Sequence, residues 1–263
     1  MSLAISVAEA ADLVASEPAG LLLLDTCALL DVIRVSNLGR KQPHHLMGAA
    51  QVIIDSARSK PRRLWLFASE PVYREWDLHA ENTSRDATNL IQGLDTSVHG
   101  IHSVLRSMQS YKLRTAEPMG ANVTLLTEAP NYSSLDIPQH LLNLARRVLD
   151  EALAPKVTDR IALTARQRSI LGKKPADKGK PSRSDCEIIE TYIALGRALG
   201  KAAEPRLFVS SNKEDFFSPR TPHDPHEDLF VDCTSANLRF VNNLSQAVSE
   251  LFGRITLEPP AGS

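Results

Sequence analysis

The chain of 263 residues is poor in cysteine and in aromatic side chains, and it has no long hydrophobic run. Its three cysteines, Cys27, Cys186 and Cys233, are too few and too far apart for a disulfide scaffold or a zinc cluster. No window holds the roughly 18 consecutive apolar residues of a membrane-spanning helix, so we expect no membrane partner. The first residues also lack the basic start and apolar run of a secretory signal. We therefore predict a protein of a reducing, cytoplasmic compartment.

An overall excess of positive charge is also missing, because 30 lysines and arginines face 31 acidic residues. This excludes the strongly basic composition that is common in nucleic-acid-binding proteins. The balance nevertheless hides a basic segment between Arg160 and Arg183, which Asp177 alone opposes. The cations within it are Arg166, Arg168, Lys173, Lys174, Lys178 and Lys180. Such a run is either a solvated loop or a segment that contacts phosphates.

Short apolar runs alternate with stretches of helical periodicity along the chain. The runs at Leu21–Leu24, Leu64–Ala68, Arg206–Ser210 and Leu238–Val241 predict strands buried on both faces. Helices are predicted over 4–16, 26–35, 46–58, from Pro71, and over 137–154, 158–171, 184–199 and 244–253. A weak strand signal covers Asn122–Leu126. The alternation indicates an α/β fold with a mainly parallel central sheet.

The organisation we expect is one domain over residues 1–258, followed by a flexible tail at 259–263. Residues from about 79 to 156 form a helical insertion without an acid at a strand end. The stretch Gly172–Arg183 is rich in Lys, Pro and Gly, which predicts a loop. Ser184 and Glu187 then fit a capping box at the start of the next helix. The tract from His223 to Asp228 lies among Pro222 and Pro225 and is expected to be a polar loop rather than a metal site.

Four acids lie where predicted strands stop or helices start. Asp25 ends the first strand, and Asp215 follows the third by about one turn. Asp185 opens a helix beside the basic loop, and Glu75 follows Pro71 by a turn, with Glu70 as its substitute. In an open parallel sheet, ligands bind outside the carboxyl ends of the strands. Because crowded carboxylates repel one another, their usual ligand is a hard cation such as Mg²⁺ or Mn²⁺.

At these positions the sequence resembles the PIN domains, a Rossmann-like family of metal-dependent nucleases. The segments LLLLDTCALLDVI, ASEPVYREW, SDCEIIETYIAL, RLFVSSNKEDFF and LRFVNNLSQAV are similar, in this order, to the successive strand and helix motifs of that family. The insertion exceeds what a minimal PIN domain needs, and its role is open. The basic loop before Asp185 resembles that of larger PIN-like proteins of the DUF4935 type rather than that of the compact toxins. The resemblance implies a three-layer α/β/α fold.

The resemblance also implies a site and a reaction. Asp25, Glu75, Asp185 and Asp215 would bind Mg²⁺ or Mn²⁺, with Thr26 and Asn212 as supporting residues. The reaction would be hydrolysis of a phosphodiester, with single-stranded RNA preferred to DNA as the nucleic-acid substrate. The residues expected to hold flanking phosphates are Lys173, Lys174, Lys178, Lys180 and Arg183. A toxin restrained by an antitoxin, another protein partner, and a housekeeping or defence role all stay open, as does the oligomeric state.

Two other classes of function remain as alternatives. The same fold can serve as a non-catalytic module that binds nucleic acid or protein, although a degenerate copy would be expected to lose some of the acids. A phosphatase could use the same acidic rim, but an aspartyl nucleophile usually has a second aspartate two positions on, where Cys27 stands. We expect Cys27 and Cys186 to be packing residues, since free cysteine is commonly a small buried hydrophobe.

Overall fold

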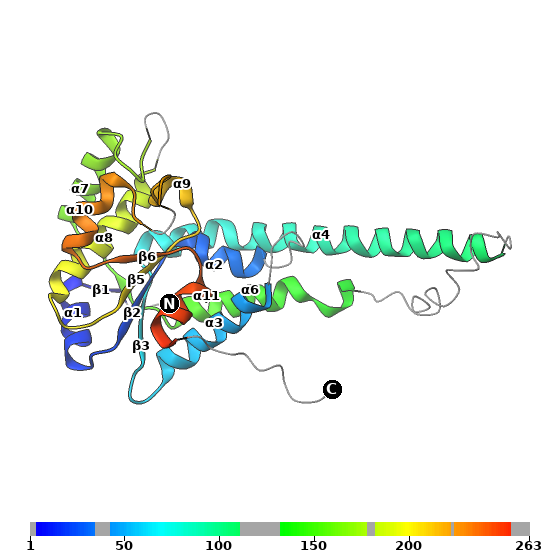
Figure 1. Cartoon of the computed structure of the whole chain (residues 1–263), viewed down its shortest axis with the longest axis horizontal. Coiled ribbons are helices and arrows are strands. Elements are labelled where there is room, and N and C mark those ends of the chain that lie inside the picture. The colour runs from blue at the N-terminus through cyan, green and yellow to red at the C-terminus, as the bar shows by residue number, and fades with distance from the viewer. Residues whose placement is uncertain (1–3, 35–42, 111–131, 178–181, 222–223, 254–263) are drawn as a thin grey trace.

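The computed structural model describes residues 4–34, 43–110, 132–177, 182–221 and 224–253 (Figure 1). Parallel strands alternate with helices, so the α/β class predicted from the sequence is confirmed. The elements are, in order, β1 (Ala4–Ile5), α1 (Val7–Ser16), β2 (Gly20–Leu24), α2 (Thr26–Ile33), α3 (Pro43–Arg58), β3 (Leu64–Phe67), α4 (Glu70–Ser110), the 3-10 turn η3 (Tyr132–Leu135), α6 (Ile137–Asp150), β4 (Ala154–Pro155), α7 (Asp159–Ile170), α8 (Arg183–Leu199), β5 (Arg206–Val209), α9 (Lys213–Phe216), α10 (Glu227–Ser235), β6 (Arg239–Val241) and α11 (Leu244–Phe252).

The central sheet has four parallel strands in the order β3-β2-β5-β6. Leu21 pairs with Trp65 on one side and with Arg206 on the other, which places β2 inside the sheet. All residues of β3 and β5, and all of β2 after Gly20, are buried. Continuous apolar strands are what a parallel sheet covered on both faces requires. A separate two-stranded sheet joins β1 to β4.

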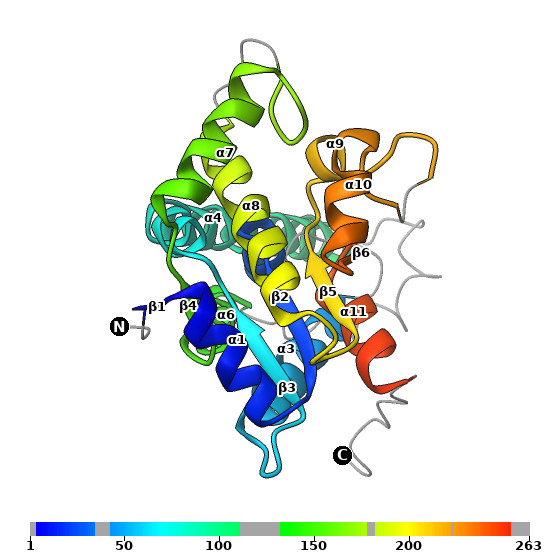
Figure 2. The same cartoon turned by 90° about the vertical axis from the view of Figure 1, so that its left-hand side faces the viewer.

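Helices cover both faces of this sheet, an arrangement compatible with three α/β/α layers. Helix α1 packs on α8 over one face, and α3 packs with α6 and α11 over the other (Figure 2). One contiguous hydrophobic core links the strands to both layers. The rim of the sheet at the carboxyl ends of the strands is therefore the part that helices leave for polar residues.

The strand order creates a topological switch point at this rim. The chain leaves β2 for β3 on one side and later returns to β5 on the other side. The connections from β2 and from β5 therefore diverge, and such a divergence leaves the crevice in which open α/β sheets bind their ligands. The residues directly after these two strands are Asp25 and Ser210.

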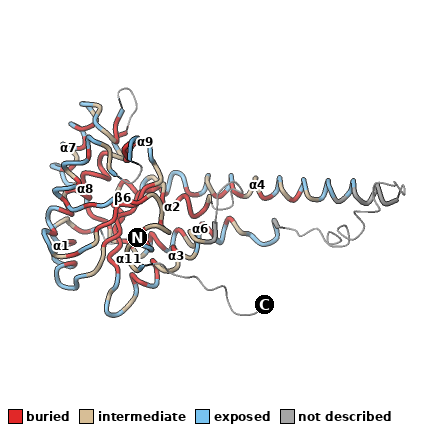
Figure 3. Tube along the Cα trace, viewed as in Figure 1, coloured by how far each residue is buried: buried red, intermediate tan, exposed pale blue. Residues whose placement is uncertain are grey.

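Helix α4 is much longer than any other element and extends beyond the body of the molecule (Figure 1). Its first half is anchored by buried residues at helical spacing, such as Val72, Trp76 and Ile91. Further along, Ile101 and Val104 are exposed, and burial fades toward the tip (Figure 3). Helix α6 packs beside the anchored half and contributes Leu142 and other residues to the main core. The range 79–156 thus combines core helix with a projecting arm.

Several local expectations differ from the structure. The helix predicted over 4–16 begins only at Val7, because Ser6 caps it and β1 precedes it. Helix α8 begins at Arg183 with Ser182 at its N-cap, so the predicted capping box at Ser184 is wrong: Ser184 is already helical. Part of the expected loop at 223–228 is helical too, since α10 starts at Glu227 with the His226 side chain as its cap.

Other expectations lie outside the described residues, including the weak strand at Asn122–Leu126 and the tail at 259–263. None of the helices in the described ranges combines the length and the apolar composition that crossing a membrane requires.

Candidate active site

Asp25 lies at the centre of the rim, between the two inner strands. Its backbone N–H donates to the carbonyl of Val209, which continues the ladder between β2 and β5. Its carboxylate accepts hydrogen bonds from the backbone N–H of Thr26 at 2.9 Å and from the Ser210 hydroxyl at 2.6 Å. The residue is 1% exposed. Asp25 therefore caps α2 and joins the ends of β2 and β5 across the switch point.

The environment of Asp25 disfavours its charged form. Burial raises the pKa of this carboxyl from its ordinary value of 3.8 to about 7, and the negative charge of Glu75 adds to the rise. The hydrogen bonds from Ser210 and Thr26 act in the opposite direction, because they stabilise the carboxylate. A buried acid that titrates near neutrality is typical of sites that bind a cation or move a proton.

Glu75 reaches the same place from α4. Its Oε2 accepts a hydrogen bond of 2.6 Å from the Thr26 hydroxyl, so Thr26 links the two acids through its backbone and its side chain. Glu70, the substitute considered from the sequence, instead accepts a hydrogen bond from the backbone N–H of Val157. Of the two glutamates, Glu75 is thus the one whose contacts join it to Asp25.

Asp215 lies in the short helix α9 after β5. The Asn212 side chain donates to its carboxylate at 2.8 Å, and the Asn212 backbone N–H donates to the Ser210 hydroxyl at 3.0 Å. Ser210 and Asn212 thereby connect Asp25 to Asp215 through successive hydrogen bonds. Lys174 approaches Asp215 from the basic loop, with 3.4 Å between Nζ and Oδ1.

Asp185 lies half-buried in the first turn of α8. Its charge and that of Asp25 both raise the pKa of the Cys27 thiol, after the larger effect of burial. Tyr192, two turns further along α8, donates to the carbonyl of Leu24 at 2.6 Å and accepts from the Ser69 N–H at 3.0 Å. This buried tyrosine fixes α8, which carries Asp185 in its first turn, to the ends of β2 and β3.

The basic loop is only partly the set of free cations that the sequence suggested. Lys173 is exposed, but Lys174 forms ion pairs with Asp177 at 2.8 Å and with Asp215. Arg183 belongs to α8 and pairs with Glu187, while Lys178 and Lys180 lie outside the described residues. Arg168 is buried and forms ion pairs with Glu190 and Asp232, so it joins α7 to α8 and α10.

The donor set at the rim is made of oxygen atoms and carries more negative than positive charge. Hard cations such as Mg²⁺ and Mn²⁺ prefer such ligands, so the residues fit a divalent ion chemically. In the described part of the chain, no three acidic, histidine or cysteine side chains are arranged as the ligands of one ion. Thr26, Asn212 and Lys174 instead hold the acids through hydrogen bonds and an ion pair.

Ser210 and Tyr192 are two residues of the rim to which the sequence alone assigns no role. Ser210 was visible as the polar residue that ends a buried strand, and this signal could have found it. Tyr192 lies within an apolar helix pattern, and nothing in the local sequence distinguishes it from a core aromatic. Cys186 and Cys233 are buried, and burial raises their thiol pKa values to about 12, in keeping with a packing role.

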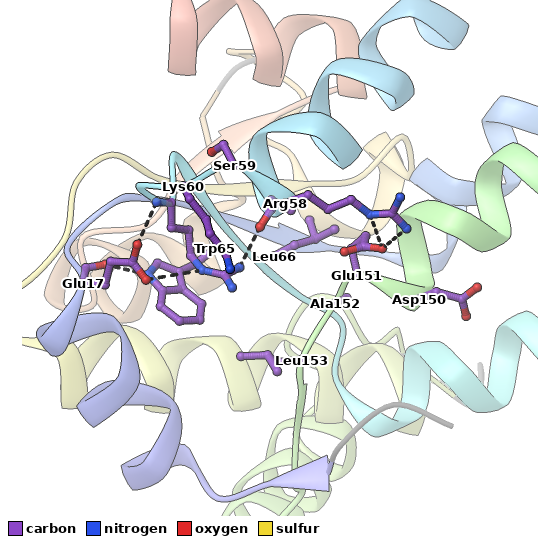
Figure 4. A pocket seen from close by; sticks show the side chains of 12 residues that line it. Glu17, Arg58, Ser59, Lys60, Trp65, Leu66, Asp150, Glu151, Ala152 and Leu153 are labelled. Atoms are coloured by element: carbon purple, nitrogen blue, oxygen red, sulfur yellow. Dashed lines mark hydrogen bonds and ion pairs between the residues drawn. The ribbon is translucent and has the colours of Figure 1, made fainter.

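A pocket of about 680 Å³ lies elsewhere, beside the outer edge of β3 (Figure 4). Its polar side chains pair with one another: Arg58 binds Glu151, and the Arg62 guanidinium lies 4.2 Å from the centre of the Trp65 ring. None of the four acids lines it. The rim, rather than this pocket, is the candidate active site.

Comparisons of the chain with protein-family models, with curated proteins and with solved structures gave no match.

Proposed function

We propose that the chain is a PIN-like, metal-dependent nuclease that cleaves single-stranded RNA in preference to DNA. The observation that carries the proposal is the Ser210–Asp25 hydrogen bond across the switch point, with Glu75 joined to the same aspartate through Thr26. A parallel sheet binds its ligands at this point, and the acids there are the ones that the family resemblance marks. The preference for RNA rests on that resemblance alone.

In this proposal each residue has a defined task. Asp25, Glu75, Asp185 and Asp215 would hold Mg²⁺ or Mn²⁺, whose chemistry is to acidify a bound water and to offset charge on the phosphate. Ser210 and the Thr26 backbone orient the Asp25 carboxylate, and Asn212 orients that of Asp215. Lys174 compensates the charge of Asp215 until a cation replaces it.

The test is cleavage of labelled single-stranded RNA and DNA in Mn²⁺, Mg²⁺ or EDTA. We expect cleavage with either metal, none with EDTA, and a loss of roughly a hundredfold or more in Asp25→Asn and Asp185→Asn, because a ligand is at least as important as its supporting groups. The matched control is Asp55→Asn. Asp55 is an exposed aspartate near the end of α3, which leads to the start of β3 rather than to its carboxyl end.

Wild-type rates in purified Asp185→Asn would end the metal-nuclease proposal. Turnover of small phosphate esters without cleavage of polynucleotides would favour a phosphatase. Binding of single strands without any cleavage would favour a non-catalytic module.

A further inference from the structure

One buried carboxylate beside the rim holds two exposed arginines. Glu187 on α8 accepts a hydrogen bond of 2.8 Å from Arg74 at Oε2 and another of 2.8 Å from Arg183 at Oε1. The Glu187 side chain is 5% exposed, whereas those of Arg74 and Arg183 are 65% and 74% exposed. The buried anion therefore serves as an anchor, and both cationic groups remain open to solvent.

This group of three residues carries a net positive charge and unused donors. A guanidinium has five N–H donors in a planar fork. The contacts with Glu187 use one nitrogen of each arginine, and the other nitrogens have no hydrogen-bond partner among the described residues. Because one carboxylate fixes both side chains, part of the entropy cost of ordering them is already met in the free protein.

The two arginines are close in sequence to two acids of the candidate active site. Arg74 directly precedes Glu75 on α4, and Arg183 precedes Asp185 by two residues on α8. The Arg74–Glu187 pair joins the same two helices that carry these acids. The arginines therefore offer positive partners beside the acidic rim, where the phosphates next to the reacting one need them.

We propose that Arg74 and Arg183, positioned by Glu187, form a binding site for a backbone phosphate of the nucleic acid next to the cleaved bond. Arginine forks match the geometry of phosphate oxygens and are preferred wherever paired donors recognise a phosphate. A contact with the backbone fixes the register of the strand and carries no base specificity. The inference rests on the proposed function, and it assigns to Arg74 a role that the sequence did not suggest.

Binding of a fluorescent single-stranded oligonucleotide, measured over a range of salt concentrations, tests this site. Asp25→Asn is the parent protein, so that the probe stays intact. In this background Arg74→Gln with Arg183→Gln should weaken binding about tenfold or more and lower the salt slope by about 0.7, the value for one lost phosphate contact on a single strand. The matched control is Arg239→Gln, an exposed arginine that is also paired with a glutamate but begins β6 at the opposite end of the sheet.

A scan with single methylphosphonate linkages, which are uncharged, locates the contact. We expect one linkage beside the cleaved bond to weaken binding to the parent protein, but not to the double variant. Arg74→Lys with Arg183→Lys should keep most of the salt slope and lose the position-specific effect, since a lysine has no fork. Melting curves and the two single Gln variants verify that a loss does not come from unfolding.

Unchanged affinity and salt slope in the double variant would overturn the site and leave Arg74–Glu187–Arg183 as a clip between helices. In that case cleavage by the wild-type chain would still support the nuclease proposal. If the parent protein binds no oligonucleotide and the wild type cleaves none, both proposals fail together.

Discussion

The hydrogen bonds of Asp25 favour its charged form, whereas its burial favours its neutral form, and without a bound cation these two effects oppose each other. Its position is fixed by donors from Thr26 and Ser210, which favour a carboxylate. Its burial and the charge of Glu75 favour the protonated acid. A site of this kind stores unfavourable electrostatic energy that a bound cation would release, so the cost should be measurable as a dependence of stability on pH.

We predict that Asp25→Asn stabilises the metal-free protein at high pH. The folded-state pKa of about 7 exceeds the ordinary value of 3.8, so the folded state binds the proton more tightly than the unfolded state. Stability from this group is present below about pH 4 and is lost as the pH rises to about 7, by at most about 4 kcal/mol. An asparagine removes that loss, and the Ser210 hydroxyl can rotate to accept from its amide.

Urea denaturation of both proteins in EDTA, at about pH 5 and about pH 8, gives the comparison. The free energy of unfolding of the variant should exceed that of the wild type mainly at the higher pH, and Asp55→Asn should show no such change. Equal pH dependence of wild type and Asp25→Asn would contradict the raised pKa.

At the scale of elements, Arg206 holds the ends of two helices together without an acidic partner. This buried arginine donates to four carbonyls, those of Gly196, Gly200, Ala203 and Ala236. The groups from α8 and α10 lie at helix C-termini, where carbonyls lack intrahelical donors and the helix dipole favours a cation. Gly196 allows the close approach, because a Cβ there would lie 2.6 Å from the Ala236 carbonyl oxygen.

We predict that Arg206→Met lowers the free energy of unfolding by about 3 kcal/mol or more, because it leaves buried carbonyls without donors. Gly196→Ala should also destabilise, although alanine gains up to about 1 kcal/mol over glycine in an isolated helix. The matched control is Gly93→Ala on α4, where nothing lies within 4 Å of the added Cβ and stability should rise. Chemical denaturation measures all three, and a stabilised Gly196→Ala would show that α8 and α10 do not approach so closely.

At the scale of the whole molecule, the projecting part of α4 is separable from the body. Asp95 accepts hydrogen bonds from the Ser133 backbone N–H, at 2.8 Å, and from the Ser133 hydroxyl, so the chain leaves the body and returns to it at adjacent points. None of the four acids lies between these residues. Helix α6 is different, because its apolar face belongs to the main core.

We predict that a short Gly/Ser linker can replace residues 97–131 with little loss of stability, cleavage or Mn²⁺-dependent rise in Tm. Deletion of α6 serves as the comparison and should unfold the protein, because it removes Leu142, Ala145 and Val148 from the main core and exposes the apolar residues that they cover. Thermal melts with and without Mn²⁺ provide the measurement. If the shortened protein folds but no longer responds to Mn²⁺, the arm contributes to the site and the prediction is wrong.

Local sequence was sufficient to identify the sheet and to place the acids at strand and helix ends. A strand buried on both faces needs a continuous apolar run, and Leu21–Leu24 and Leu64–Phe67 are such runs, so their ends could be located without knowing their neighbours. Helix boundaries were less certain. At the start of α8, for example, Ser182 and Ser184 are both suitable N-cap residues, and the sequence does not distinguish between them.

Only the tertiary structure decided which side chains meet. Asp25 and Ser210 are 185 positions apart, and their hydrogen bond depends on β5 lying beside β2. The same holds for the ion pair between Lys174 and Asp215. It also holds for Arg168, which the sequence shows only as one cation of the basic segment, but which lies buried between acids from α8 and α10. Strand and helix periodicity records how each segment faces the core, whereas pairing between distant side chains follows from strand order and helix packing, and no local pattern encodes these.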